Sequence, residues 1–171
     1  IEHYLEPVPG IAEGGELVVR GPNIMQGYLF HGSDGHIIPP WTPSRGAGWY
    51  ATGDIVTLDA DGYVTIRGRA KRFAKIGGEM VSLAAVEELA YTLAPEARHA
   101  ALAVSDARKG EQIVLISETA ALTRAALHDA AKNARISELA VPRRIVHRDA
   151  LPLLGSGKID YTALRSQLDR P

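Results

Sequence analysis

A lysine near the end of the chain lies in a glycine-rich string that could bring a positive charge to a reaction. Residues 155–158 are Gly-Ser-Gly-Lys. The string lacks the Gly-x-x-x-x-Gly-Lys-Ser/Thr spacing of a triphosphatase loop, and Ile159 stands where the magnesium-binding hydroxyl would be. Lys158 on a flexible loop could still stabilise negative charge in a transition state. An exposed turn lysine is the more common origin of such strings.

An acidic residue, Asp54, ends the string Gly-Trp-Tyr-Ala-Thr-Gly-Asp at 48–54. A carboxylate held just after a glycine and before a strand could accept hydrogen bonds from neighbouring ribose hydroxyls. Thr52 and Asp54 could instead merely close a turn, which is the commoner case for this spacing alone.

A basic run precedes a pair of glycines. Five cations occur in the nine residues 67–75, and Gly77 and Gly78 follow. Such a run could bind a phosphate while the glycines let a narrow ligand pass close to the backbone. A solvated basic linker that ends in a turn explains the same residues.

The first part of the chain has the pattern of short strands. Residues 15–22 predict a strand that enters a Gly-Pro turn, and 55–67 predict a hairpin around a turn at 59–62. Residues 30–48 are rich in Gly, Pro, Ser and His and predict a long surface loop. The stretch 67–72 is expected to be flexible and to mark a domain boundary.

The second part predicts helices mixed with strands, and hence an α+β fold. Ser82 can cap a helix that Pro95 stops, Thr123 can cap a second helix, and Asp160 can cap a third. Buried strands are expected at 100–104 and 112–117, with a short strand at 144–147.

Composition excludes several classes of function. The formal net charge of the 171 residues is -1, which gives no overall attraction to nucleic acid. The absence of cysteine excludes disulfides and thiol catalysis. The six histidines show no metal-ligand spacing, so no metal site is expected. No segment is long and apolar enough to cross a bilayer. The first residue is Ile1, and we expect a piece of a longer polypeptide.

Four strings in a fixed order carry a family resemblance. They are Gly-Glu-Leu-x-x-Arg-Gly-Pro at 15–22, the string at 48–54, Asp-Gly-Tyr-x-x-x-x-Gly-Arg-x-Lys at 61–71, and the late Gly-Lys at 157–158. Together they resemble the adenylate-forming superfamily of acyl-CoA synthetases, luciferases and peptide-synthetase adenylation domains. The strings at 72–82 and 151–158 are similar to the acyl-acyl carrier protein synthetase branch, in which the synthetase is often fused to a lysophosphatidylethanolamine acyltransferase.

The resemblance implies a domain organisation and a reaction. Residues 1–70 would be the β-rich end of a large N-terminal domain, and 71–171 the C-terminal lid. The parent enzyme would use ATP and Mg²⁺ to convert a fatty acid to an acyl-adenylate, which a phosphopantetheine thiol then attacks. This chain alone, without the ATP phosphate loop, is expected to be inactive and to hold no cofactor.

The resemblance also implies roles for particular residues. Asp54 would bind the ribose hydroxyls and Arg69 would contact the nucleotide. Lys71 would be the hinge of the lid. Lys158 would act in adenylation. In the rotated lid, Lys75 would face the site and Gly78 would keep the pantetheine channel open.

The thiol partner is left open between acyl carrier protein and coenzyme A. The chain could alternatively be the lid of a fatty acyl-CoA synthetase, or serve mainly to dock a carrier protein through Arg67, Arg72 and Arg143. The parent is expected on the cytoplasmic side, attached to the inner membrane through regions outside this chain.

Overall fold

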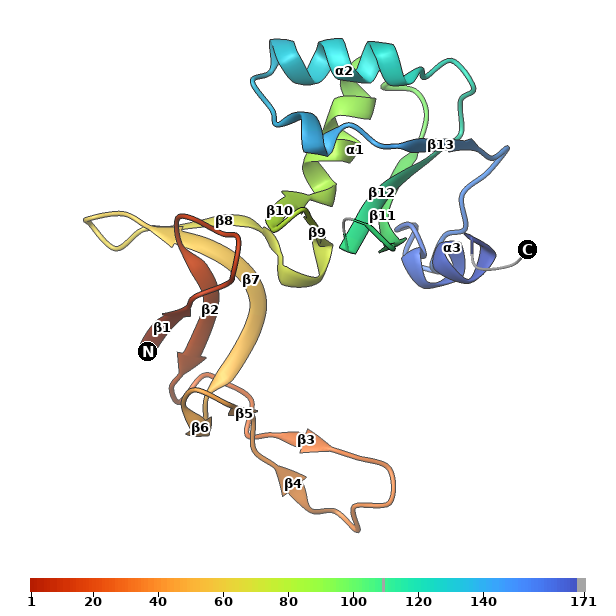
Figure 1. Cartoon of the computed structure of the whole chain (residues 1–171). Coiled ribbons are helices and arrows are strands. Elements are labelled where there is room, and N and C mark those ends of the chain that lie inside the picture. Colours follow the sequence, from red (N-terminus) through yellow and green to blue (C-terminus); the bar gives the residue numbers. More distant parts are fainter. Residues whose placement is uncertain (109, 169–171) are drawn as a thin grey trace. The chain divides into compact units, whose positions relative to one another are not determined.

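An antiparallel sheet of four strands organises the first of two units, Ile1–Lys71 (Figure 1). The structure is a computed structural model, and it describes residues 1–108 and 110–168. Val18, Ile55 and Val56 are almost completely buried and form the small core of this sheet. In sheet order, the strands are β1 (Glu2–Glu6), β2 (Gly15–Arg20), β7 (Tyr50–Leu58) and β8 (Val64–Arg69).

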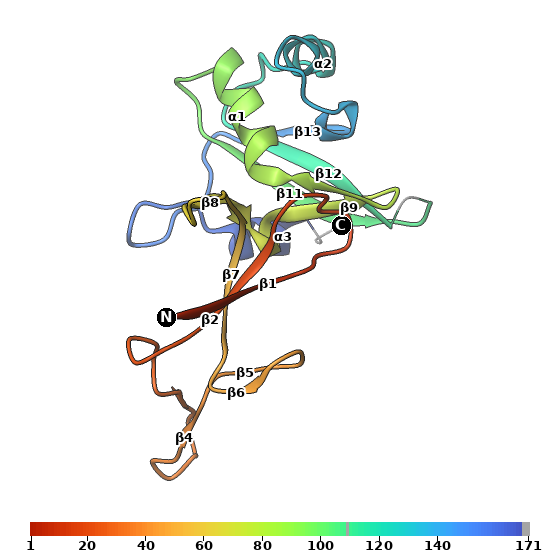
Figure 2. The same cartoon turned by 90° about the vertical axis from the view of Figure 1, so that its left-hand side faces the viewer.

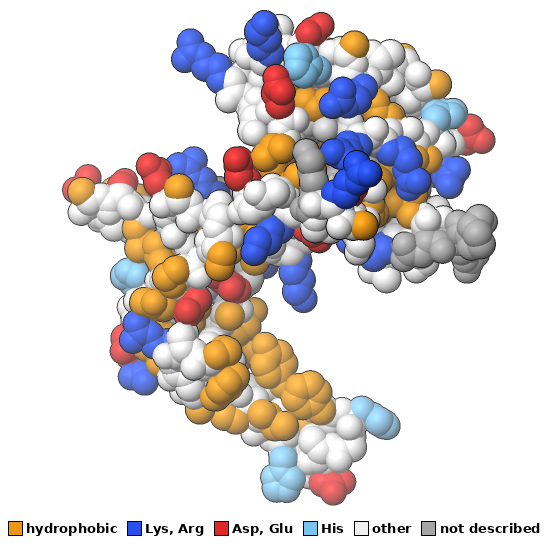
Figure 3. Space-filling model, in the orientation of Figure 1, with side chains coloured by type: hydrophobic (Ala, Val, Ile, Leu, Met, Phe, Trp, Pro, Cys, Tyr) orange, Lys and Arg blue, Asp and Glu red, His pale blue; other side chains and the backbone are white. Residues whose placement is uncertain are grey.

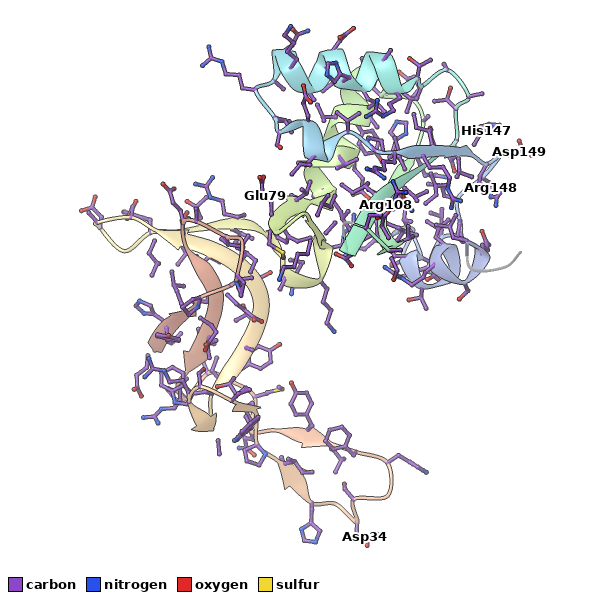
Figure 4. The ribbon with its side chains drawn as sticks, viewed as in Figure 1. Asp34, Glu79, Arg108, His147, Arg148 and Asp149 are labelled. Atoms are coloured by element: carbon purple, nitrogen blue, oxygen red, sulfur yellow. The ribbon has the colours of Figure 1, made fainter. Side chains whose placement is uncertain are left out.

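Two ladders of two-residue strands lie between β2 and β7 in the sequence. The first ladder carries an exposed apolar surface, on which Leu29 is 68% exposed. Figure 3 shows hydrophobic side chains gathered over it, and Asp34 lies at its tip (Figure 4). The paired strands are β3 (Tyr28–Leu29) with β4 (Ile37–Ile38), and β5 (Trp41–Thr42) with β6 (Gly46–Ala47).

The predicted strand at 15–22 and the predicted hairpin at 55–67 are confirmed as β2 and as β7 with β8. The long surface loop predicted at 30–48 also contains three of the short strands, which was not expected. Strands of two residues are too short to show alternation. The stretch at 67–72, predicted to be flexible, has regular structure: β8 continues to Arg69 and a 3₁₀ turn, η1 (Ala70–Arg72), follows.

The second unit, Arg72–Pro171, is built on a five-stranded sheet. Its long strands β11 and β12 are antiparallel over eight residue pairs, and β13 joins β12 in parallel. The strands run in the order β10-β9-β12-β11, with β13 beside β12. Their bounds are β9 (Phe73–Ile76), β10 (Glu79–Ser82), β11 (His99–Asp106), β12 (Gly110–Ser117) and β13 (Arg144–His147).

Both faces of this sheet are covered. Alternate residues of β11 and β12, such as Ala101 and Leu115, face one core with α1 and α2, while Leu102 and Val114 face a second core that includes Leu164 of α3. Figures 1 and 2 agree that α1 and α2 lie on the side of the sheet opposite to α3. The long strands are therefore apolar on both faces. The helices are α1 (Leu83–Leu93), α2 (Arg124–Asn133) and α3 (Tyr161–Leu168), with a 3₁₀ turn η2 (Glu138–Ala140).

The predicted helix caps are confirmed. Ser82 Oγ accepts a hydrogen bond from Ala85 N at 3.3 Å, Thr123 Oγ1 accepts one from Ala126 N at 3.2 Å, and Asp160 accepts one from Ala163 N at 3.0 Å. The expected strands and the expected α+β class are confirmed as well.

The hairpin of β9 and β10 was not predicted. Gly77 and Gly78 connect the strands with φ angles of +60° and +95°. A two-residue turn of this kind needs positive φ at both positions, which glycine adopts without strain. The paired glycines are thus a hairpin turn.

Glu118, directly after β12, holds the segment after β13 against the sheet. Glu118 Oε1 accepts a hydrogen bond from Leu151 N at 2.8 Å, and Oε2 accepts one from Arg98 N at 3.3 Å. Desolvation raises the pKa of this carboxyl, but the bonds from Leu151 and Arg98 and the Arg98 guanidinium outweigh it and lower the pKa below its usual value.

We expect Leu115→Ala to reduce the free energy of unfolding of the second unit by about 2–5 kcal/mol, because the side chain is fully buried and its removal leaves a cavity. Leu154→Ala, at a position that is 48% exposed, is the matched control and should change it by no more than about 0.5 kcal/mol. Urea unfolding followed by circular dichroism measures both. Equal effects would contradict this assignment of the core.

The lowered pKa of Glu118 predicts a pH dependence of stability. A carboxyl with a lowered folded pKa stabilises the fold above its unfolded pKa of 4.5, and this contribution is lost as pH falls through the folded pKa. Wild-type protein and Glu118→Gln should therefore differ in urea midpoint at neutral pH and converge in acid. Glu96→Gln, at an exposed site, is the control. A difference that stays constant down to acid pH would refute the prediction.

Candidate functional site

A bulge in β7 places Asp54. Register pairs join Glu16 to Ile55 and Val18 to Ala51, so that Leu17 alone lies opposite residues 52–54. Gly53 takes a φ of +75° in this bulge. Asp54 was expected before a strand, and that is wrong: β7 is continuous through it. A bulge re-aims the side chain that follows it.

The hydroxyl of Thr52 forms hydrogen bonds with the backbone at the bulge. Its hydroxyl donates to Leu17 O at 2.9 Å and accepts from Asp54 N at 3.1 Å. The backbone groups that lose their ladder partners are thereby satisfied. The Thr-Gly-Asp order therefore has a local structural explanation. The Thr52 hydroxyl bonds to the backbone, Gly53 adopts the positive φ of the bulge, and Asp54 is placed by it.

Asp54 and Arg69 lie opposite each other on β7 and β8. Arg69 Nε is 2.9 Å from Asp54 Oδ1, and Arg69 Nη1 donates to Thr52 O at 3.1 Å. The side chain of Asp54 is 20% exposed and that of Arg69 is 64% exposed. A carboxylate has about four lone-pair sites, so a pair with one guanidinium leaves capacity to accept from hydroxyls. The structure thus brings together the two residues expected to bind a nucleotide.

Lys158 lies on a tight turn between β13 and α3. Leu154 N donates to Lys158 O at 2.8 Å and Gly157 N donates to Leu154 O at 2.8 Å, with Gly157 at a φ of +80°. Leu153 and Ile159 pair across the base of the turn. Among the described residues, the exposed Lys158 side chain makes no hydrogen bond or ion pair. We call residues 151–160 the lysine loop.

The lysine loop is held at both ends. Leu151 is buried and bonds to Glu118, and Asp160 N donates to Pro152 O at 2.8 Å. Figure 4 labels His147, Arg148 and Asp149 where the chain leaves β13 toward this loop, and Arg148 N donates to Ser117 O at 3.0 Å. The ends are fixed while the charged tip is exposed to solvent.

Lys75 and Gly78 lie on the hairpin of β9 and β10. Lys75 is exposed between the buried residues Ala74 and Ile76, and its N–H donates to Glu111 Oε2 at 2.5 Å. A Cβ at Gly78 would meet nothing within 4 Å, so the need for glycine in this structure comes from φ and not from crowding. No hydrogen bond or ion pair among the described residues joins this hairpin to the lysine loop.

Lys71 is exposed in η1 and is the last residue of the first unit. Its role as a hinge stays a prediction. The next residue, Arg72, was expected to supply charge for docking a carrier protein, and this stays a prediction; its guanidinium lies 2.6 Å from the Glu87 carboxylate. Arg143 lies 3.6 Å from Asp106, and Arg67 is exposed.

Glu87 and Tyr161, which were not predicted as notable residues, contact Arg72 in the second unit. Tyr161 Oη donates to Glu87 Oε1 at 2.9 Å. Burial, and then the charge of Glu87, raise the pKa of Tyr161 to about 12. The sequence does indicate that Glu87 is unusual, because it lies four residues after Leu83 and three before Ala90, on the apolar face of α1.

Over the described residues, no group of three His, Cys, Asp or Glu side chains could hold a metal ion. Within the same residues, no helix has the length and apolarity needed to cross a membrane.

Comparison with known proteins identifies relatives over nearly the whole chain. A 2-hydroxy-7-methoxy-5-methyl-1-naphthoate–CoA ligase of Streptomyces carzinostaticus is 35% identical over 164 residues, which are 94% of this chain and 28% of the relative. A 3-methylmercaptopropionyl-CoA ligase of Ruegeria pomeroyi is 35% identical over 90% of this chain and 27% of its own length. A 2,3-dihydroxybenzoate-AMP ligase of Bacillus subtilis is 33% identical over 98% of this chain and 30% of its own length. The chain spans less than a third of each relative. No family model matches it.

Solved structures have the same fold. An o-succinylbenzoate CoA synthetase from Bacillus subtilis, in complex with its acyl-adenylate intermediate, has a TM-score of 0.71 and 26% identity over 99% of this chain and 34% of that one. ATP-bound MatB from Rhodopseudomonas palustris has a TM-score of 0.69 over 93% of this chain and 31% of that one, and at 23% identity it supports the fold alone. Sequence and fold together support the placement of this chain in the adenylate-forming (AMP-binding, acyl-CoA ligase) superfamily.

Proposed function

We propose that this chain is the C-terminal part of an ATP-dependent ligase that joins a carboxylic acid to a thiol, with the second unit as its lid. The observation that carries the proposal is the pair of Asp54 and Arg69 at 2.9 Å, in a chain whose relatives are named CoA ligases and AMP ligases. Two further features favour a role in a larger protein. The first unit has an exposed apolar ladder, and the relatives are more than three times as long.

In the proposed reaction, an oxygen of the substrate carboxylate attacks the α-phosphorus of ATP, and the bond to pyrophosphate breaks. The thiol then attacks the acyl carbon, loses its proton, and displaces AMP. Asp54 accepts from the ribose hydroxyls, and Arg69 both holds Asp54 and contacts the nucleotide. The lysine loop brings the Lys158 cation to the charge that grows on the phosphate oxygens.

Mg²⁺ would belong to the parent enzyme and not to these residues. The described part of the chain has no cluster of three possible metal ligands, and no step is assigned to the ion.

The second half-reaction would use the other side of the lid. Lys75 is exposed in β9, and Lys158 is exposed in the turn of the lysine loop. A rotation at Lys71 would exchange the lysine presented to the substrate, so that one lid serves two reactions.

Coenzyme A is the acceptor that the relatives favour, since several are CoA ligases. The strings at 72–82 and 151–158 favour the second candidate, an acyl carrier protein synthetase with lysophosphatidylethanolamine acyltransferase activity. In that case the parent would act on the cytoplasmic side, attached to the inner membrane through other regions. Of the residues expected to dock the carrier, Arg67 is exposed and outside any ion pair among the described residues.

Lys158→Ala in the full-length enzyme should slow acyl-adenylate formation about 10²–10³-fold, the usual effect of losing one group that stabilises transition-state charge. Thioester formation from supplied acyl-adenylate should be unchanged, and Lys75→Ala should give the reverse pattern. ATP–pyrophosphate exchange and thioester assays measure the two steps. Lys132→Ala, an exposed lysine on α2, is the control. Unchanged adenylation in Lys158→Ala would refute the role of this lysine.

The acceptor is tested by kcat/KM of the full-length enzyme with coenzyme A and with a phosphopantetheinylated carrier protein. We expect the higher value with coenzyme A. A higher value with the carrier protein would overturn this choice in favour of the second candidate. The 171-residue chain alone should give no ATP–pyrophosphate exchange.

A further inference from the structure

One carboxylate oxygen in the second unit receives three hydrogen bonds. Glu87 Oε1 accepts from Arg72 Nη2 at 2.6 Å, from Ala101 N at 2.7 Å and from Tyr161 Oη at 2.9 Å. The side chain of Glu87 is only 13% exposed. The three donors come from the start of the unit, from β11 and from α3, so the bonds join segments far apart in the sequence.

Arg72 and Tyr161 also contact each other. The guanidinium carbon of Arg72 lies 4.0 Å from the centre of the Tyr161 ring, and Arg72 Nη1 donates to Ala101 O at 3.0 Å. A planar guanidinium can stack on an aromatic face while its edge donates hydrogen bonds. Arg72 is thereby fixed in one orientation by Glu87, Ala101 and Tyr161.

The positions of these residues connect two parts of the proposed mechanism. Arg72 directly follows Lys71, where the first unit ends, and Tyr161 is the third residue after Lys158 and the first of α3. At the other end of the lysine loop, Leu151 is held by Glu118.

We propose that Tyr161 is a positioning residue, which fixes the lysine loop to Arg72 through Glu87 so that loop and hinge-side segment move as one body. The structural link between the lysine loop and Arg72 does not depend on the proposed function. Its consequence for adenylation rests on the proposed function. The Tyr161 hydroxyl stays protonated and able to donate throughout the physiological range, because its pKa is about 12.

A role in packing alone is the competing explanation, because the Tyr161 ring also contacts the core formed with Leu151 and Leu164. Tyr161→Phe separates the two roles, since it keeps the ring and removes the hydroxyl. Tyr91→Phe is the matched control: Tyr91 is in the same unit, its ring lies against His99, and its hydroxyl has no hydrogen bond among the described residues.

Hydrogen exchange of the 171-residue chain, read by mass spectrometry, tests the structural part. Peptides that cover 151–164 should exchange about tenfold faster in Tyr161→Phe, because a hydrogen bond to a charged group is lost. Peptides of β11 and β12 should be unchanged, which checks that the unit stays folded. Equal exchange over 151–164 in wild type, Tyr161→Phe and Tyr91→Phe would overturn the proposal.

The catalytic consequence is tested in the full-length enzyme. Tyr161→Phe should lower kcat for acyl-adenylate formation about tenfold, with a smaller change in KM for ATP and no change in thioester formation from supplied acyl-adenylate. Equal losses in both half-reactions would indicate packing alone and contradict the proposal. Full adenylation activity in Tyr161→Phe, in an assay where Lys158→Ala is inactive, would also contradict the proposal. If Lys158→Ala keeps full adenylation, the proposed role of Lys158 fails, and the exchange result still decides the structural part.

Discussion

The burial of the Glu87 carboxylate is the constraint on which the second unit depends. Removal of an ionised group from water is costly by several kcal/mol unless charge and hydrogen bonds compensate. Compensation here requires Arg72, the backbone of β11 and Tyr161 of α3 to be in place together. The first residue of the unit and its last helix are therefore fixed relative to α1 by the same oxygen. The position of the lysine loop follows from that arrangement.

In both units, several of the residues with proposed chemistry lie where regular structure is interrupted. Asp54 follows a bulge that Thr52 and Gly53 create in β7, and Lys158 and Gly78 lie on tight turns. The sheet of the second unit, covered on both faces, is a firm support for these turns. Exposed charges held by a rigid scaffold suit a lid that presents different groups in successive steps.

Local rules explain how much of the fold could be predicted from the sequence. Ser82, Thr123 and Asp160 satisfy the first N–H groups of their helices, and a capping residue before an apolar repeat shows this without any tertiary information. The hairpin of β9 and β10 was hidden because paired glycines suit a phosphate loop as well as a turn. Asp54 was a candidate from its local string, whereas the nucleotide contact of Arg69 was predicted only through the family resemblance. The cluster around Glu87 joins distant residues that no local pattern could bring together.

A double-mutant cycle between Glu87→Gln and Tyr161→Phe tests most directly whether Glu87 joins the lysine loop to the rest of the unit. Unfolding free energies of wild type, both single variants and the double variant give the coupling energy. Residues in one hydrogen-bond network couple by about 0.5–3 kcal/mol, and we predict a value of at least about 1 kcal/mol. Additive effects of the two substitutions, with a coupling energy near zero, would contradict the account.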